Sequence, residues 1–143
     1  MFRMTILTSD PIMREAGELF AVMLNAHLTL VEDAAAIEPR TTDVILWRPE
    51  SLTEAAAIEL ARFELPVMIF FPTQDIRLGG RVGRILGLSA HWMRWPFNPE
   101  AAAVSIHQIV VESVIQRVVQ RSLTRLHQAR YASNSTSDDR EVP

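Results

Sequence analysis

Apolar residues along the chain alternate between short runs and longer helical repeats, and this alternation predicts strands and the helices between them. The short runs are rich in β-branched and aromatic residues, as is typical of strands covered on both faces. We expect strands at 5–8, 28–31, 43–47, 66–71 and 91–95. The longer segments repeat apolar residues every three or four positions. They predict helices at 11–25, 51–63, 75–88 and about 99–130, with a short helical turn at 33–38.

Local signals mark the start of two of these helices. Asp10 precedes Pro11, which suits an N-cap followed by proline in the first turn. Ser51 and Glu54 have the spacing of a capping box. The segment 75–88 includes Gly79, Gly80 and Gly83, each of which costs roughly 1 kcal/mol against alanine in a helix. We therefore expect it to be the least stable helix.

The alternation of strands and helices predicts an α/β fold, with a doubly wound five-stranded parallel sheet and helices on both faces. The length of 143 residues favours one domain. We expect this domain to cover residues 1–130, including an extended last helix at about 99–130. Residues 131–143 are polar, and we expect them to form a disordered tail.

Composition excludes several kinds of chemistry. The chain has no cysteine, and all 14 basic residues are arginine, so thiol catalysis and any mechanism that needs a lysine ammonium are excluded. A net charge of −3 does not by itself predict a nucleic-acid or membrane partner. We find neither a secretory signal nor an apolar run that approaches 18 residues, so we expect a cytoplasmic protein without a membrane span.

Three segments together resemble the receiver domain of two-component response regulators. They are TSDPIMRE after the first strand, PVMIFFPT at the fourth, and GLSAHWMRWPFNP at the fifth. The last is the most specific, because it is similar to the Gly-Ala-x-x-Tyr-x-x-Lys-Pro-Phe ending of that family. The resemblance covers about residues 4–115. It implies the flavodoxin-like strand order 2-1-3-4-5, with a pocket at the carboxyl ends of strands one, three, four and five.

The residues that perform phosphoryl transfer in receiver domains are replaced in this sequence. Thr8 and Ser9 stand where the family has two acidic residues that hold Mg²⁺. The phosphoacceptor aspartate corresponds to Trp47 or Arg48, depending on where a one-residue gap is placed. The remaining positions of the degenerate pocket are Asp10, Phe71 in place of Ser/Thr, Thr73 in the following loop, and Trp95 in place of lysine.

Phosphoryl transfer by this route needs carboxylates on Mg²⁺, and Asp10 alone cannot supply them. The sequence therefore predicts a receiver fold that is not phosphorylated, with no catalytic residues, no metal site and no cofactor. The segment between Val31 and Asp43 is also shorter than usual, so we expect a stunted second helix. An alternative use of the pocket is the binding of an anionic or nucleotide-like ligand by Arg48 and Arg94, with the neighbouring indoles stacking on the ligand.

The last helix has more apolar residues than one packing face requires. The surplus predicts an interaction or dimerisation surface, formed by Val111, Val114, Ile115, Val118, Val119, Leu123 and Leu126. The same helix also carries a basic ridge, formed by Arg117, Arg121 and Arg125. This ridge fits either a solvated face, which we favour, or a surface for nucleic acid or an acidic partner.

Two hypotheses of different class follow. The favoured one is a pseudo-receiver that regulates signalling or transcription by binding a second copy of itself, or another signalling protein, through its last helices and a short coiled coil. The other is a ligand sensor that uses the Trp/Arg pocket. The receiver part of an antiterminator-type regulator is a further alternative. No output segment follows the last helix in this sequence, so a stand-alone regulator and a piece of a longer protein both stay open.

Overall fold

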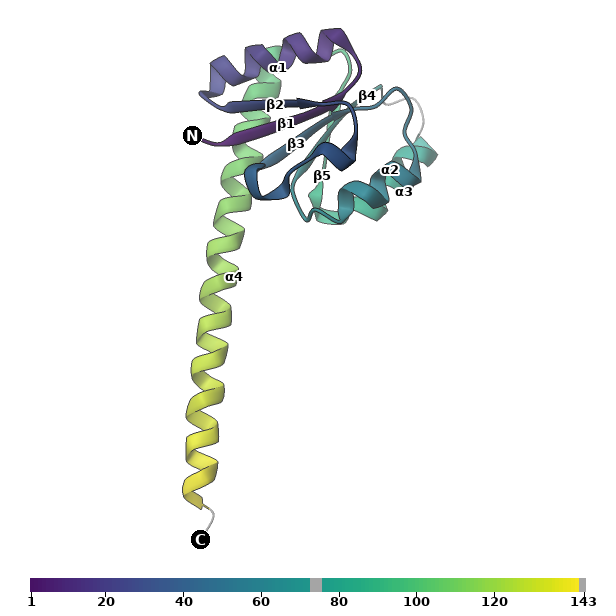
Figure 1. Ribbon diagram of the computed structural model, residues 1–143. Coiled ribbons are helices and arrows are strands. Elements are labelled where there is room, and N and C mark those ends of the chain that lie inside the picture. The colour runs from purple at the N-terminus through teal and green to yellow at the C-terminus, as the bar shows by residue number, and fades with distance from the viewer. Residues whose placement is uncertain (73–75, 142–143) are drawn as a thin grey trace. The chain divides into compact units, whose positions relative to one another are not determined.

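A computed structural model of the chain shows a five-stranded parallel sheet with the strand order β2-β1-β3-β4-β5 (Figure 1). It describes residues 1–72 and 76–141, apart from the side chains of residues 76–78 and 133–141. The strands are β1 (Arg3–Thr8), β2 (His27–Val31), β3 (Val44–Arg48), β4 (Val67–Phe71) and β5 (Ala90–Arg94). The doubly wound fold and the strand order predicted from the sequence are confirmed.

In the described part of the chain, three α-helices and three short 3₁₀ turns lie between the strands, and a fourth α-helix follows β5. The helices are α1 (Pro11–Leu24), α2 (Glu54–Ala61), α3 (Ile76–Leu86) and α4 (Pro99–Glu141), and the 3₁₀ turns are η1 (Ala34–Ala36), η2 (Pro39–Thr41) and η3 (Gly87–Ser89). Only η1 and η2 lie between β2 and β3. The second helix of the fold is therefore reduced to two single turns, as the short segment in the sequence predicted.

The α-helices α1, α2 and α4 each have a side-chain cap at the N-terminal end. The Oδ1 atom of Asp10 accepts a hydrogen bond from the backbone N–H of Ile12, which confirms the predicted N-cap of α1. The predicted capping box of Ser51 and Glu54 is wrong, because Thr53 caps α2 instead and accepts from the N–H of Ala56. Leu52 is buried between the two candidate caps, so the chain is anchored there before the helix begins. The Oδ1 atom of Asn98 accepts from two N–H groups in the first turn of α4.

The sheet is covered on both faces, and each face has its own apolar core. One core joins alternate residues of β1, β3 and β4 to α1 and the start of α4, and it includes Phe20, Phe70 and Ile106. The other joins the intervening strand residues to η1, α2 and α3, and it includes Trp47 and Leu60. Because successive strand residues point to opposite faces, the uninterrupted apolar runs of β3 and β4 serve both cores.

Two of the glycines of α3, Gly79 and Gly83, have a packing reason. A Cβ atom on Gly79 would lie 3.7 Å from the Trp92 ring, and one on Gly83 would lie 4.0 Å from it. The two glycines are one helical turn apart, so they share a face of α3. This face lets the indole of β5 lie close to the helix backbone. The sequence had indicated only a weak helix here.

The chain divides into two compact units, Met1–Val110 and Val111–Pro143, which we call unit 1 and unit 2. The sheet and both cores belong to unit 1, and the described part of unit 2 is a single helical segment of α4. The sequence placed the end of the last helix near residue 130, whereas α4 extends to Glu141. Extending an existing helix fixes one residue for each hydrogen bond gained, so residues of modest propensity can continue it.

Candidate functional site

A cavity of about 410 Å³ opens where β1 and β3 end, beside the loops that follow them. This is the topological switch point of the sheet, because β2 and β3 lie on opposite sides of β1. The residues that line the cavity come from the β1, β3 and β2 ends and from α2: Leu7, Thr8, Ser9, Glu32, Asp33, Ala34, Trp47, Arg48, Pro49, Glu50, Ser51, Ala56 and Glu59. Four of the sequence-predicted pocket residues, Thr8, Ser9, Trp47 and Arg48, are therefore brought together.

The polar residues after β1 are engaged in local hydrogen bonds. Thr8 is buried, and its hydroxyl donates to the carbonyl of Arg48 at 3.0 Å and accepts from the N–H of Asp10 at 3.0 Å. The Ser9 hydroxyl donates to Glu50 at 3.0 Å on the surface. Asp10 uses its carboxylate as the cap of α1. These groups stabilise the loop, and Asp10 lies outside the residues that line the cavity.

Trp47 and Arg48 point to opposite faces of the sheet. Trp47 is only 3% exposed and belongs to the core beneath α2 and α3. The guanidinium carbon of Arg48 lies 4.7 Å from the centroid of the Trp95 ring and 5.8 Å from that of Phe71. Arg48 is thus the β3 residue whose cation lies over the aromatic rings of Phe71 and Trp95, at the ends of β4 and β5. One of its terminal nitrogens donates to the carbonyl of Pro49.

The electrostatic character of the cavity is mixed. The Nε atom of Arg48 is buried and has no hydrogen-bond partner among the described residues. The lining also includes four acidic residues, Glu32, Asp33, Glu50 and Glu59. Sequence reasoning missed these four acids. Glu50 directly follows the exit proline of β3, and this position could have indicated it.

The remaining predicted pocket residues that the structure describes, Asp10, Phe71, Arg94 and Trp95, are not among those that line the cavity. Arg94 is exposed and pairs in register with Phe71 on the edge strand β5. Trp95 packs against Phe97, with ring centroids 5.5 Å apart, and neither Arg94 nor Trp95 is among the residues that line the cavity. Thr73 lies outside the described residues. Within the described part of the chain, no group of three or more His, Cys, Asp or Glu side chains is placed to hold a metal ion.

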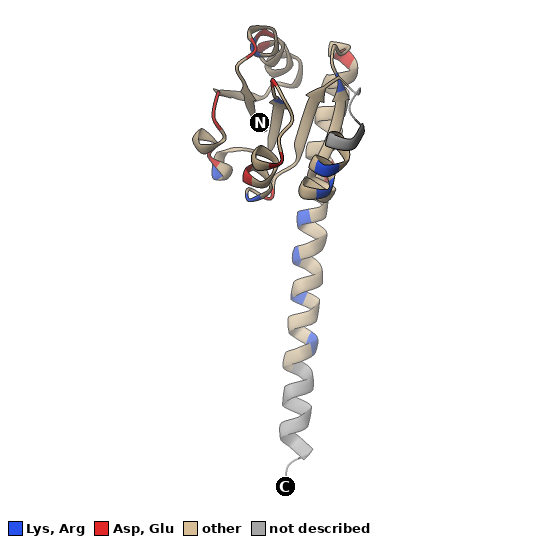
Figure 2. Ribbon diagram, turned by 90° about the vertical axis from the view of Figure 1, so that its right-hand side faces the viewer, with Lys and Arg blue, Asp and Glu red and all other residues tan. Residues whose placement is uncertain are grey.

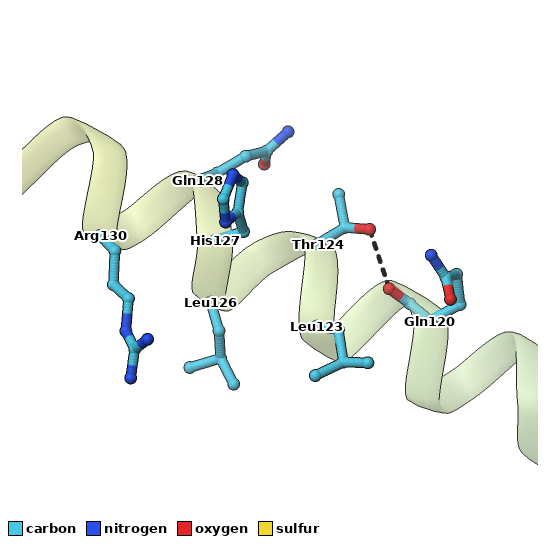
Figure 3. Close-up of a pocket in the computed structure, with 7 residues that line it drawn as sticks. All are labelled: Gln120, Leu123, Thr124, Leu126, His127, Gln128 and Arg130. Atoms are coloured by element: carbon cyan, nitrogen blue, oxygen red, sulfur yellow. Dashed lines mark hydrogen bonds between the residues drawn. The ribbon is translucent and has the colours of Figure 1, made fainter.

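The second candidate surface is the apolar part of α4 in unit 2. The predicted interaction residues are all exposed, from 42% for Val111 to 62% for Leu126. In unit 1, by contrast, α4 buries Ala102, Ala103, Ile106, Ile109 and Val110 in the core. A hollow along unit 2 is lined by residues of this one helix only (Figure 3), so it is an open surface between side chains.

Basic residues repeat along the same segment (Figure 2). Arg117, Arg121 and Arg125 are exposed, and the ion pairs found among the described residues involve other side chains. Glu112 is the acidic residue nearest to them in the sequence. The ridge is therefore positively charged and faces solvent in the single chain.

The segment Pro99–Ala132 of α4 is long and apolar enough to span a membrane by length and composition. This differs from the sequence-based expectation, which counted uninterrupted apolar runs. The core helix of a soluble protein passes the same test, and 28% of the most apolar window is buried. The test alone is weak evidence for a membrane span.

Comparison with known proteins identifies the fold. No protein-family model and no curated protein sequence matches the chain. Solved structures do match. A receiver domain (CheY-like) from Methanospirillum hungatei JF-1 has a TM-score of 0.68 at 13% identity, covering 81% of this chain and 98% of that one. The signal receiver domain of an HD domain-containing protein from Pseudomonas fluorescens Pf-5 has a TM-score of 0.66 at 11% identity. The match covers 81% of this chain and 91% of that one.

A third match comes from a family of redox sensors in the streptococci that evolved from two-component response regulators. Its TM-score is 0.66 at 17% identity, covering 82% of this chain and 54% of that one. At these identities the likeness establishes the fold and not the activity. The chain has the fold of response-regulator receiver domains, which confirms the resemblance seen in the sequence.

Proposed function

We propose that the chain is a pseudo-receiver, which is not phosphorylated and which acts in cytoplasmic signalling by associating through α4. The favoured partner is a second copy of the chain, and another signalling protein is the alternative. A receiver fold is typical of signalling and regulatory domains. Beyond this general role, we infer that the chain has lost the phosphorylation chemistry and uses the exposed surface of α4 for association.

The first support comes from the carboxyl ends of the strands. Transfer of a phosphoryl group to a receiver needs an acceptor carboxylate and acidic ligands for Mg²⁺. The hydroxyl of Thr8 and the carboxylate of Asp10 are already used in the β1–α1 loop. The end of β3 presents a guanidinium that stacks on Trp95. A cation at this position can neither accept a phosphoryl group nor bind a metal ion.

The observation that carries the proposal is the exposed apolar surface of α4. Seven aliphatic side chains between Val111 and Leu126 are at least 42% exposed along one helix. Single exposed apolar residues are ordinary, but a contiguous set on one element indicates an interaction site. Because β-branched residues are mediocre helix formers, packing against a partner would also stabilise this segment.

Light scattering over a concentration series tests the association. We expect the intact chain to form dimers, and Val119→Glu to weaken them about tenfold or more, because it places a charge in an apolar contact. Val22→Glu is the matched control, since Val22 is 81% exposed on α1 and lies outside the proposed surface. A chain that stays monomeric at every concentration would contradict association with itself.

Incubation with acetyl phosphate and Mg²⁺, followed by intact-mass measurement, tests the chemistry. We expect no added phosphate under conditions that fully modify an active receiver domain. An acid-labile adduct on this chain would contradict the pseudo-receiver assignment.

The ligand-sensing alternative rests on the buried, unpartnered Nε of Arg48. The four carboxylates that line the same cavity oppose an anion there, and Arg94 does not line it. A thermal-shift panel of phosphates and nucleotides separates the two functions, since a ligand at 100 times its Kd would add about 2.7 kcal/mol to the free energy of unfolding. We expect no shift.

A further inference from the structure

One stripe of unit 2 has opposite charges at its two ends. Its members are three or four residues apart, the spacing that places side chains on one face of a helix. They are Glu112, Ile115, Val119, Leu123, Leu126 and Arg130, all exposed. We call this set the α4 stripe. An acid begins it, four aliphatic residues form its middle, and a base ends it.

The two charged ends lie on the same line along the helix. Residues 112 and 130 are about five turns apart at 3.6 residues per turn, so their side chains leave the helix in the same direction. Figure 3 shows Arg130 on the same side of the helix as Leu123 and Leu126, with Thr124 and Gln128 on the other side. The charges are too far apart to pair within one chain, since five turns of helix rise about 27 Å.

The basic ridge lies on the other side of the helix. At about 100° per residue, Arg117 and Arg121 point roughly 160° away from Val119, and Arg125 about 120° away. Two helices can therefore meet through the α4 stripe without bringing the two ridges together.

The direction of pairing decides which charges meet. In a parallel pair in register, Glu112 lies beside its own copy and Arg130 beside its own copy, and both contacts are repulsive. In an antiparallel pair centred near residue 121, Glu112 lies opposite Arg130 of the partner subunit, twice by symmetry. The same register places Val119 opposite Leu123 of the partner subunit, so the aliphatic middle is also matched.

The size of the electrostatic preference is modest but measurable. Each exposed ion pair changes an association constant by about 1.4- to 5-fold, and the two pairs of an antiparallel dimer by about 2- to 30-fold. The helix dipoles also favour the antiparallel arrangement, because each helix end lies beside the oppositely charged end of the other helix.

We propose that unit 2 binds unit 2 of a second copy as an antiparallel helix pair through the α4 stripe, with Glu112 and Arg130 closing the contact at both ends. This inference rests on the self-association proposed above and specifies its partner, direction and register. The aliphatic residues provide the affinity, and the terminal charges select the antiparallel arrangement.

Cross-linking of the full chain tests the direction, because the chain has no cysteine of its own. The Glu112→Cys and Arg130→Cys variants are prepared separately and treated with a short bis-maleimide, alone and as a mixture. We expect cross-linked dimers in the mixture and little in either variant alone. Efficient cross-linking of each variant with itself would indicate a parallel pair and overturn the inference, while leaving self-association intact.

Charge reversal gives an independent measure. Glu112→Arg and Arg130→Glu each place like charges together at both ends of an antiparallel pair, so each weakens dimerisation by about 3- to 30-fold. The double variant restores opposite charges and recovers the original dissociation constant within about twofold. If the double variant shows no recovery, the register is wrong. If the unmodified chain does not dimerise, or if α4 binds lipid vesicles as a monomer, both this inference and the proposed self-association fail.

Discussion

The guanidinium carbon of Arg48 lies 4.7 Å from the centroid of the Trp95 ring, and this contact joins the end of β3 to the residue after β5. The Phe71 ring, at the end of β4, lies 5.8 Å from the same carbon. Three adjacent strand ends are thus linked by one cation and two rings. The arrangement stabilises the carboxyl edge of the sheet, in the region where the receiver resemblance would place a metal and a phosphate.

Replacing Trp95 should reveal the strength of this link. Trp95→Leu removes the cation–π contact and part of the packing against Phe97, and we expect it to lower the free energy of unfolding by about 1–3 kcal/mol. Arg94→Ala is the control, because Arg94 is the exposed residue directly before Trp95 and its loss should change stability by less than about 0.5 kcal/mol. Urea denaturation measures both. A double-mutant cycle with Arg48→Met should give a coupling of about 0.5–1 kcal/mol, and strictly additive losses would show that the cation contributes nothing.

The hydroxyl of Thr8 is expected to matter far more than that of its neighbour Ser9. Thr8→Val keeps the shape of the side chain but leaves the carbonyl of Arg48 and the N–H of Asp10 without their partner at a buried position. We expect a loss of about 1–3 kcal/mol. Ser9→Ala removes an exposed bond to Glu50 and should cost at most about 0.5 kcal/mol. Equal effects in thermal denaturation would contradict the assigned role of Thr8.

Alanine should have opposite effects at two helical glycines. A Cβ on Gly17 would lie 2.0 Å from the Cδ1 atom of Ile6, which is fully buried, so we expect Gly17→Ala to destabilise unit 1 by about 1–3 kcal/mol. A Cβ on Gly80 meets nothing within 4 Å, and Gly80→Ala should stabilise by about 0.4–1 kcal/mol. Chemical denaturation of both variants gives the comparison. Destabilisation by Gly80→Ala would show that α3 needs its glycine for another reason.

The sequence predicted the fold because its signals are redundant. The strands β3 and β4 serve both cores with continuous apolar runs, and such runs are readable without a structure. The start of α2 was misplaced because Ser51 and Thr53 are both good caps, and the choice between them depends on the burial of Leu52. That burial is a tertiary fact, which the local spacing does not contain.

The site was less predictable than the fold. Trp47 and Arg48 follow each other on β3 and point to opposite faces of the sheet, yet both are among the residues that line the cavity. Glu32 and Asp33 follow β2, whereas Glu59 lies on α2, far from them in the chain. No spacing within one segment could have predicted that they line the same cavity as Arg48.

Removing the basic ridge should leave self-association unchanged. The ridge and the α4 stripe lie on different sides of the same helix, so Arg117→Gln, Arg121→Gln and Arg125→Gln together should alter the dissociation constant of the dimer by less than about twofold. The matched variant, Leu123→Gln with Leu126→Gln, removes apolar side chains from the stripe and should weaken the dimer about tenfold or more. Sedimentation equilibrium of the full chain measures both variants. If the arginine variant dissociates while the leucine variant does not, then the helices meet through the ridge side, and the polar face of unit 2 is the interface.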